Sequence, residues 1–441
     1  MIAATVTLFF TIRYFGEGLA ALPAPAPSTA NGRTATPDTL WHLLLALTAV
    51  VVAGQALGRG FRAFHQPVVI GQVIAGILLG PSLLGRISPQ AMQYVLPAEV
   101  APFLGLLAQL GVIFYMFLVG LDLDADLLRG QFRATAWTSH ASIALPFTLG
   151  SALALYLYPR LSSNQVPFTH FALFLGVAMS ITAFPVLARI LAERDMTNTR
   201  LGALALTCAA VDDVTAWCLL AFVVGVVSAA AGGALAVGLL TAGFIAFMFI
   251  VVRPVFHRLA PASGGAAPSR GMLAATLTSV LIAALVTEAI GVHAIFGAFL
   301  LGAVIPRDSA LARTLIQSLE DLVTVLILPA FFAFTGMRTE IGLVSGAFEW
   351  AIVALIIVVA TVGKFGGTLI AARWSGLDWR YAAGLGILMN TRGLMELIVL
   401  NVGLDLGVVS PTLFTMLVLM ALVTTIATTP ILRRLFPANP L

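Results

Sequence analysis

Charged residues are rare in this sequence: Asp, Glu, Lys and Arg make up 10% of its 441 residues, whereas 60% are hydrophobic. So few polar side chains cannot cover the surface of a soluble globule, and we expect an all-α polytopic membrane protein. The sequence also lacks a GxxxxGKS/T phosphate loop, an HExxH motif and a basic run. These absences argue against an ATP-driven pump, a zinc protease and a nucleic-acid-binding protein, and we expect no cofactor.

Cysteine and lysine are scarce as well. Cys208 and Cys218, the two cysteines, lie in one apolar stretch without metal-ligand spacing, so we interpret them as small apolar wall residues. Lys364 is the single lysine, and it lies among glycines in an apolar run. A buried ammonium must find an anion, lose its proton or reach the interface along its own stem. We predict that Lys364 compensates a buried anion; a snorkelling side chain is the alternative.

Apolar runs follow one another from Leu40 onward, and we count about 13 candidate spans at roughly twenty residues per crossing. They centre near residues 40–57, 68–84, 100–120, 134–157, 168–192, 201–228, 232–252, 271–289, 292–305, 319–337, 346–372, 382–403 and 410–432. Residues 1–39 precede them, with a short apolar run and an Ala/Pro-rich stretch. A signal peptide and an amphipathic leader both remain open for that segment.

Arginines alternate between the loops of this arrangement. Loops after odd-numbered spans hold Arg59, Arg62, Arg129, Arg133, Arg189, Arg194, Arg200, Arg253, Arg258, Arg270, Arg307, Arg313, Arg373, Arg380, Arg433 and Arg434. Loops after even-numbered spans hold Arg86, Arg160 and Arg338, and the leader holds Arg13 and Arg33. By the positive-inside rule the C-terminus is expected on the cytoplasmic side of a plasma or inner membrane.

Two adjacent carboxylates, Asp212 and Asp213, lie near the middle of the apolar stretch 203–220. A carboxylate at mid-membrane costs about 2.5–3.5 kcal/mol on insertion scales, so the pair indicates ion or proton handling. Helical neighbours point about 100° apart, so we predict divided labour. One carboxylate pairs with Lys364, while the other binds a proton or a cation. Because the proton and the cation compete for that second carboxylate, their movements are coupled without ATP.

Pro185 interrupts the span before the aspartates, in GVAMSITAFPVLARIL. Proline removes one backbone hydrogen bond and disfavours helix at Phe184. Thr182 and the freed carbonyls there can offer oxygen ligands to a monovalent cation. A simple kink is the alternative.

A second interrupted span is GILMNTRGLMELIVLNVG, which contains Asn390, Thr391, Arg392 and Glu396. Polar interruptions at corresponding places in two halves are typical of a transporter site built from discontinuous helices, and we expect Asn390 and Thr391 to line it. Arg392 and Glu396 are four residues apart, which predicts a stabilising ion pair on one helix face.

Three stretches resemble the monovalent cation:proton antiporter-2 family, and within it the plant cation/proton exchangers and their bacterial relatives. They are SITAFPVLARILAE at 180–193, AAVDDVTAWCLLA at 209–221 and the segment 389–425 that begins MNTRGLMELIVLN. The resemblance covers residues 40–435. It implies a homodimeric elevator-type antiporter with inverted repeats and two crossing discontinuous helices. Core helices are expected at 134–228 and 346–432, dimerisation helices at 40–120 and 271–337, and a linker helix at 232–252.

The resemblance also implies roles for the charged residues. Asp213 matches the aspartate that carries the ion or proton, and Asp212 occupies a position that is Asp or Asn among relatives. Lys364 matches the lysine that pairs with the first aspartate in sodium/proton antiporters of the Asp-Asp type. The chain ends shortly after the last span, so we expect no C-terminal regulatory domain.

Our leading hypothesis is a secondary antiporter, not an enzyme, that exchanges Na+ or K+ for H+. The sequence favours neither cation, because selectivity depends on cavity size, ligand number and field strength. The alternative is a cation channel or gated K+ efflux path in which the aspartates form a passive site. An intramembrane aspartyl protease is disfavoured, because its dyad needs carboxylates that face each other from different helices.

Overall fold

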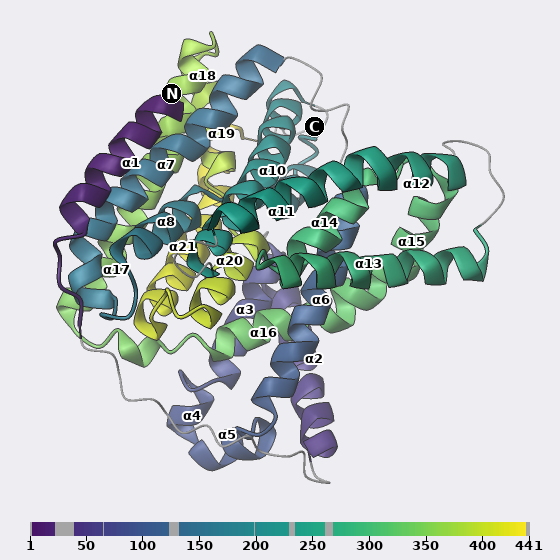
Figure 1. Cartoon of the computed structure of the whole chain (residues 1–441). Coiled ribbons are helices and arrows are strands. Elements are labelled where there is room, and N and C mark those ends of the chain that lie inside the picture. Colours follow the sequence, from purple (N-terminus) through teal and green to yellow (C-terminus); the bar gives the residue numbers. More distant parts are fainter. Residues whose placement is uncertain are drawn as a thin grey trace.

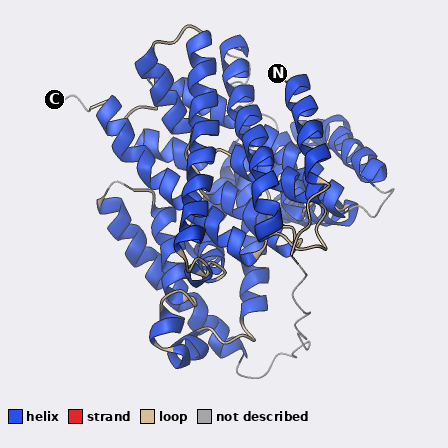
Figure 2. Cartoon of the chain, turned by 90° about the vertical axis from the view of Figure 1, so that its left-hand side faces the viewer, coloured by secondary structure: helices blue, strands red, loops and turns tan. Residues whose placement is uncertain are grey.

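The structure, a computed structural model, describes residues 2–22, 39–64, 66–122, 132–197, 199–228, 234–260 and 268–437. Throughout these ranges the regular elements are helices, apart from one isolated bridge between Leu22 and Ser163 (Figure 2). The predicted all-α class is confirmed. Arg33 and Arg129, which entered the arginine pattern, lie outside the described residues.

Eleven helices of the described part are long and apolar enough to cross a membrane. The bent pair α19 (Trp379–Met389) and α20 (Leu394–Asp405) makes a twelfth, with an angle of 43° between its halves. The remaining predicted span, 292–305, corresponds to α14 (Ala294–Val304), which has 11 residues. At 1.5 Å per residue such a helix is about 16 Å long, shorter than the hydrocarbon core. The exact number of thirteen crossings therefore stays a prediction.

One group of helices packs around α6 and α16 (Figure 1). Its members are α2 (Thr39–Ala63), α3 (Val68–Leu79), α4 (Leu84–Ile87), α5 (Pro89–Val95), α6 (Ala101–Asp122), α13 (Arg270–Ile290), α14, α15 (Ala310–Asp321) and α16 (Leu328–Met337). Glycines allow close approach in this group. A Cβ added to Gly120 of α6 would lie 2.2 Å from the carbonyl oxygen of Phe299 of α14, and one added to Gly76 of α3 would lie 2.4 Å from that of Ala333 of α16.

A second group packs around α7 and α10. Its members are α7 (Phe132–Leu161), α8 (Phe168–Ser180), α9 (Phe184–Ala192), α10 (Arg200–Ser228), α17 (Ala347–Thr361), α18 (Gly367–Trp374), α19, α20 and α21 (Pro411–Leu435). The helix α1 (Ile2–Gly16) lies along α7, where the ring centroids of Phe9 and Phe147 are 6.0 Å apart (Figure 1). The described part of the leader is therefore a packed helix.

A long segment joins the two groups. It consists of α11 (Ala234–Phe247), the π-helical turn η1 (Met248–Val252) and α12 (Arg253–Leu259). This segment contacts α10 of the second group and α13 and α14 of the first. It runs across the upper right of Figure 1.

Both predicted interruptions are present, and they meet. The α8 helix ends at Ser180 and α9 begins at Phe184, while α19 ends at Met389 and α20 begins at Leu394. The backbone N–H of Ala183 donates to the carbonyl oxygen of Thr391 across 3.0 Å. The two non-helical segments therefore lie against each other, inside the second group.

Candidate functional site

The first break leaves the carbonyl groups at the end of α8 without helical partners, as every helix end does. Two cations satisfy them. Arg392 donates from Nη1 to the carbonyl of Ala178 (2.9 Å) and from Nη2 to that of Met179 (2.7 Å), and Lys364 Nζ donates to that of Ser180 (2.5 Å). Positive charge at this end also complements the helix dipole.

On the other side of the same break, Phe184 and Pro185 form the first turn of α9. Proline is well tolerated there because the N–H it lacks would have no helical partner. Pro185 therefore starts a separate helix instead of bending a continuous one. The backbone N–H of Phe184, at the positive end of α9, faces the carboxyl group of Asp213.

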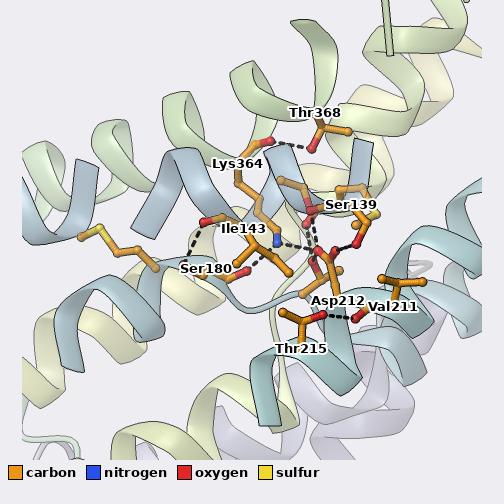
Figure 3. A network of polar contacts seen from close by, with 12 residues as sticks. Ser139, Ile143, Ser180, Val211, Asp212, Thr215, Lys364 and Thr368 are labelled. Atoms are coloured by element: carbon orange, nitrogen blue, oxygen red, sulfur yellow. Dashed lines mark hydrogen bonds and ion pairs between the residues drawn. The ribbon is translucent and has the colours of Figure 1, made fainter. Parts of the chain in front are cut away.

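Asp212 and Lys364 form an ion pair in which neither side chain is exposed to solvent, with 2.8 Å between Oδ2 and Nζ. Lys364 belongs to the π-helical turn η4 (Val362–Gly366) between α17 and α18, and its carbonyl accepts from Thr368 Oγ1 at 2.7 Å. Such π-turns inside helices frequently mark functional sites. In Figure 3 the lysine nitrogen points between Ser180 and Asp212.

Hydroxyl groups complete the surroundings of Asp212. Thr182, a predicted site residue, donates to Oδ2 at 2.9 Å. Ser139 donates to Oδ1 at 2.5 Å (Figure 3). Ser142 donates to Oδ2 at 2.6 Å. The sequence analysis missed these two serines. Their three-residue spacing on one face of an apolar span was the available signal.

Asp213 has different surroundings. Its side chain is 4% exposed, and its Oδ1 is buried without a hydrogen-bond partner among the described residues. It lies at a small cavity whose other lining residues come from α10 and from both broken spans: Ile181, Ala216, Trp217, Met395 and Val399. A buried carboxylate oxygen without a donor is costly unless a proton or a cation occupies it.

Asn390 and Thr391 supply further oxygens at the crossing. Asn390 Oδ1 and Thr391 Oγ1 are both buried and without a hydrogen-bond partner in the described part of the chain. The carbonyl oxygen of Thr391 accepts a hydrogen bond from the N–H of Ala183 in the first break. The side chains of Asn390 and Thr391 form no hydrogen bond with Asp213. Asp213, Asn390 and Thr391 thus each present a side-chain oxygen that has no donor among the described residues.

Arg392 and Glu396 form the second wholly buried ion pair, with 2.6 Å between Nη1 and Oε2. Thr425 of α21 accepts from the Arg392 N–H at 3.0 Å and donates to the Arg392 carbonyl at 2.6 Å. Arg392 therefore connects the second break to α8 through its side chain and to α21 through its backbone. All of these contacts lie within the second group, and Arg392 Nε and Glu396 Oε1 are buried without a hydrogen-bond partner among the described residues.

Comparison with known proteins agrees with this architecture. Residues 44–436 match the family model described as sodium/hydrogen exchanger, transmembrane. The chain is 45% identical to the Na(+)/H(+) antiporter NhaS4 of Synechocystis, over 91% of this chain and 99% of that protein. It is 38% identical to cation/H(+) antiporter 19 of Arabidopsis thaliana, over 94% of this chain and 52% of that protein. It is 34% identical to K(+)/H(+) antiporter 1 of Saccharomyces cerevisiae, over 86% and 44%.

The chain therefore spans nearly all of the cyanobacterial relative and about half the length of the plant and yeast relatives. The solved sodium proton antiporter MjNhaP1 from Methanocaldococcus jannaschii shares the fold, with a TM-score of 0.68 over 89% of this chain and 98% of that one, at 14% identity. The resemblance inferred from the three motifs is confirmed by these matches. On the family match over residues 44–436, the protein belongs to the sodium/hydrogen exchanger transmembrane family.

Proposed function

We propose that the protein is a secondary antiporter that exchanges Na+ or K+ for H+ across a membrane. The observation that carries this proposal is the contrast between the two buried aspartates. Asp212 is paired with Lys364, whereas Asp213 keeps an unpartnered oxygen at the crossing of two broken spans. The names of the relatives, which are Na+/H+, cation/H+ and K+/H+ antiporters, support the same chemistry.

Competition at Asp213 couples the two ions. One carboxylate holds either a proton or a cation, so arrival of the cation releases the proton and protonation releases the cation. The Asp212–Lys364 pair is neutral as a unit, so the occupant of Asp213 sets the net charge of these three groups. Moving an uncompensated charge past the lipid barrier costs far more free energy than moving a neutralised group. The site therefore moves only when Asp213 holds a proton or a cation, and it does not move when Asp213 is empty.

The broken helices provide the remaining ligands in this proposal. Oxygens at discontinuous helices replace part of the hydration shell of a cation, as in other transporters. Thr182, Asn390 and Thr391 are the residues we assign to this lining, next to Phe184 and Pro185 at the start of α9. The preference for Na+ or K+ is measured by adding each cation in turn in the experiment below.

The movement that exposes the site is proposed to be of the elevator type. The helices at 134–228 and 346–432 would form a core that slides against dimerisation helices at 40–120 and 271–337, with 232–252 as linker. Their separate packing into two groups supports this division. The protein would act as a homodimer in a plasma or inner membrane with a cytoplasmic C-terminus, in keeping with the arginine distribution.

The channel alternative is not favoured, because the relatives compared above are named as antiporters. The test is dissipation of a pH gradient in proteoliposomes on addition of Na+, K+ or Li+. Asp213→Asn should abolish cation-dependent proton movement. Glu193→Gln should retain it, since Glu193 loses an equal charge at the surface, where it pairs with Arg189. Wild-type rates in Asp213→Asn, or cation flux that persists when proton movement is blocked, would refute the proposal.

A further inference from the structure

Both oxygens of the Asp212 carboxylate accept hydrogen bonds, four in all. Its Oδ2 accepts from Lys364 at 2.8 Å, from Ser142 at 2.6 Å and from Thr182 at 2.9 Å. Its Oδ1 accepts from Ser139 at 2.5 Å. Each carboxylate oxygen offers about two lone-pair sites, so three donors crowd Oδ2 while Ser139 occupies one of the two sites on Oδ1. A cation could reach Oδ2 only by displacing a donor, and at Oδ1 it would have to share the oxygen with Ser139.

Two of the four donors belong to a helix that carries none of the predicted site residues. Ser139 and Ser142 are wholly buried and lie on one face of α7, three residues apart. This helix packs against α8, α10, α18 and the turn η4 that carries Lys364. The packing of α7 therefore holds the two hydroxyls in place.

A serine hydroxyl has a single hydrogen, so it can donate to only one acceptor at a time. Ser142 Oγ lies 2.6 Å from Asp212 Oδ2 and 2.8 Å from the carbonyl oxygen of Ser139. Hydrogen bonds to an ionised oxygen are roughly twice as strong as those between neutral groups. The Ser142 hydrogen is therefore directed at Asp212.

Asp213 is equally buried yet accepts no hydrogen bond at Oδ1. The difference between the neighbours follows from direction, because successive helical side chains diverge by about 100°. Asp212 points towards α7 and Lys364, and Asp213 towards the cavity between the broken spans. The hydroxyls of Ser139 and Ser142 can therefore donate to Asp212 but not to Asp213.

We propose that Ser139 and Ser142 are positioning residues that hold Asp212 as a fixed counter-charge for Lys364 and prevent it from becoming a second ligand of the transported cation. The inference rests on the proposed cation/proton exchange. It leaves Asp213 as the only carboxylate that binds the cargo. Without the hydroxyls, freed oxygens of Asp212 become available to the cation, which then binds more tightly and leaves more slowly.

The test measures initial rates of cation-dependent proton movement against cation concentration for wild type, Ser139→Ala and Ser142→Ala in proteoliposomes. We expect the KM for the cation to fall by about three- to tenfold, within the range that a typical intramolecular hydrogen bond contributes, together with a lower kcat. Ser142→Thr keeps a hydroxyl and should restore the wild-type KM. For a variant that folds without transporting, the cation concentration giving half of the thermal stabilisation replaces KM, with the same expected direction.

Ser151→Ala is the matched control. Ser151 is also wholly buried on α7, but its hydroxyl donates to the backbone carbonyl of Ala172 at 3.2 Å and not to a carboxylate. Its KM should equal that of wild type. The inference is overturned if the Ser139 and Ser142 variants lower kcat at an unchanged KM, or if Ser142→Thr behaves like Ser142→Ala. A wild-type protein without cation-dependent proton movement would instead refute the proposed function, so the two failures are distinct.

Discussion

Lys364 and Asp212 are 152 residues apart in the chain, yet they form an ion pair of 2.8 Å that excludes solvent from both side chains. Desolvation of two charges is repaid only when the geometry is good and further hydrogen bonds satisfy the remaining atoms. Here the carbonyl of Ser180 and three hydroxyls provide those bonds. The pair is therefore an integral part of the core, and its disruption has consequences for folding as well as for transport.

The first prediction concerns charge balance in this pair. Asp212→Asn and Lys364→Gln each leave one buried charge without its partner, so each should lower the free energy of unfolding by about 3–5 kcal/mol. The double variant removes both charges and should recover most of that loss. Thermal unfolding in detergent, followed by tryptophan fluorescence, measures all three. Arg189→Gln, which breaks an exposed pair, is the control and should cost less than about 1 kcal/mol. Additive losses in the double variant would contradict this account of the pair.

The second prediction concerns Arg392, whose two guanidinium nitrogens bind two successive carbonyl groups of α8. Lysine has one nitrogen and cannot reproduce this forked geometry. Arg392→Lys should therefore give markedly less monodisperse protein and a lower Tm than wild type. Arg59→Lys, at an exposed arginine of α2 outside the crossing, is the control and should be nearly neutral. Size-exclusion chromatography and thermal unfolding measure both variants, and an Arg392→Lys protein as stable as wild type would show that the fork is dispensable.

The third prediction concerns binding of the cargo. A ligand that binds only the folded state stabilises it by mass action, by about 2.7 kcal/mol at one hundred times its Kd. NaCl or KCl should therefore raise the Tm of the wild type relative to choline chloride at the same ionic strength. Asp213→Asn should show no difference between these salts. The cation with the larger effect identifies the preferred substrate, and an equal response of Asp213→Asn would place the binding site elsewhere.

The fourth prediction tests the elevator movement. Asn401 Nδ2 of α20 donates to Thr335 Oγ1 of α16 at 2.8 Å, and this bond joins the two packing groups. Thr335→Cys combined with Asn401→Cys places two thiols at these contacting positions, where Hg2+ can bridge them. In a background with Cys208→Ala and Cys218→Ala, the cross-link should stop exchange, and a thiol reductant should restore it. Thr335→Cys alone is the control. Exchange that continues in the fully cross-linked protein would exclude sliding of α20 past α16.

Some elements of the site could be predicted because the local sequence dictates them. Pro185 cannot occupy a helix interior without loss of a hydrogen bond, and the residue before it avoids helical geometry. The proline predicted an interruption here, but the structure places it at residues 181–183 and includes Phe184 in α9, so the expected non-helical geometry at Phe184 was wrong. The ion pair of Arg392 with Glu396 was similarly predictable, since residues four apart on a helix are neighbours.

Other elements could not be predicted because they depend on contacts between distant segments. Ser139 and Ser142 look like ordinary small residues until α7 packs beside α10, some 70 residues further along the chain. The hydrogen bonds of Lys364 and Arg392 to the end of α8 could not be predicted either, because their acceptors are backbone carbonyl groups, which every residue has.

Amino-acid composition and local backbone chemistry are enough to predict that this protein lies in a lipid bilayer and that two of its helices are interrupted. Its scarcity of charge leaves lipid as the only medium that long apolar helices can face, and Pro185 and the Asn390–Gly393 segment interrupt helices through local backbone chemistry. Only the tertiary structure decided which of the two aspartates is enclosed by donors. Helical geometry separates their directions without saying which one faces a neighbour, and the packing of α7 and η4 around Asp212 leaves Asp213 as the carboxylate with a free oxygen.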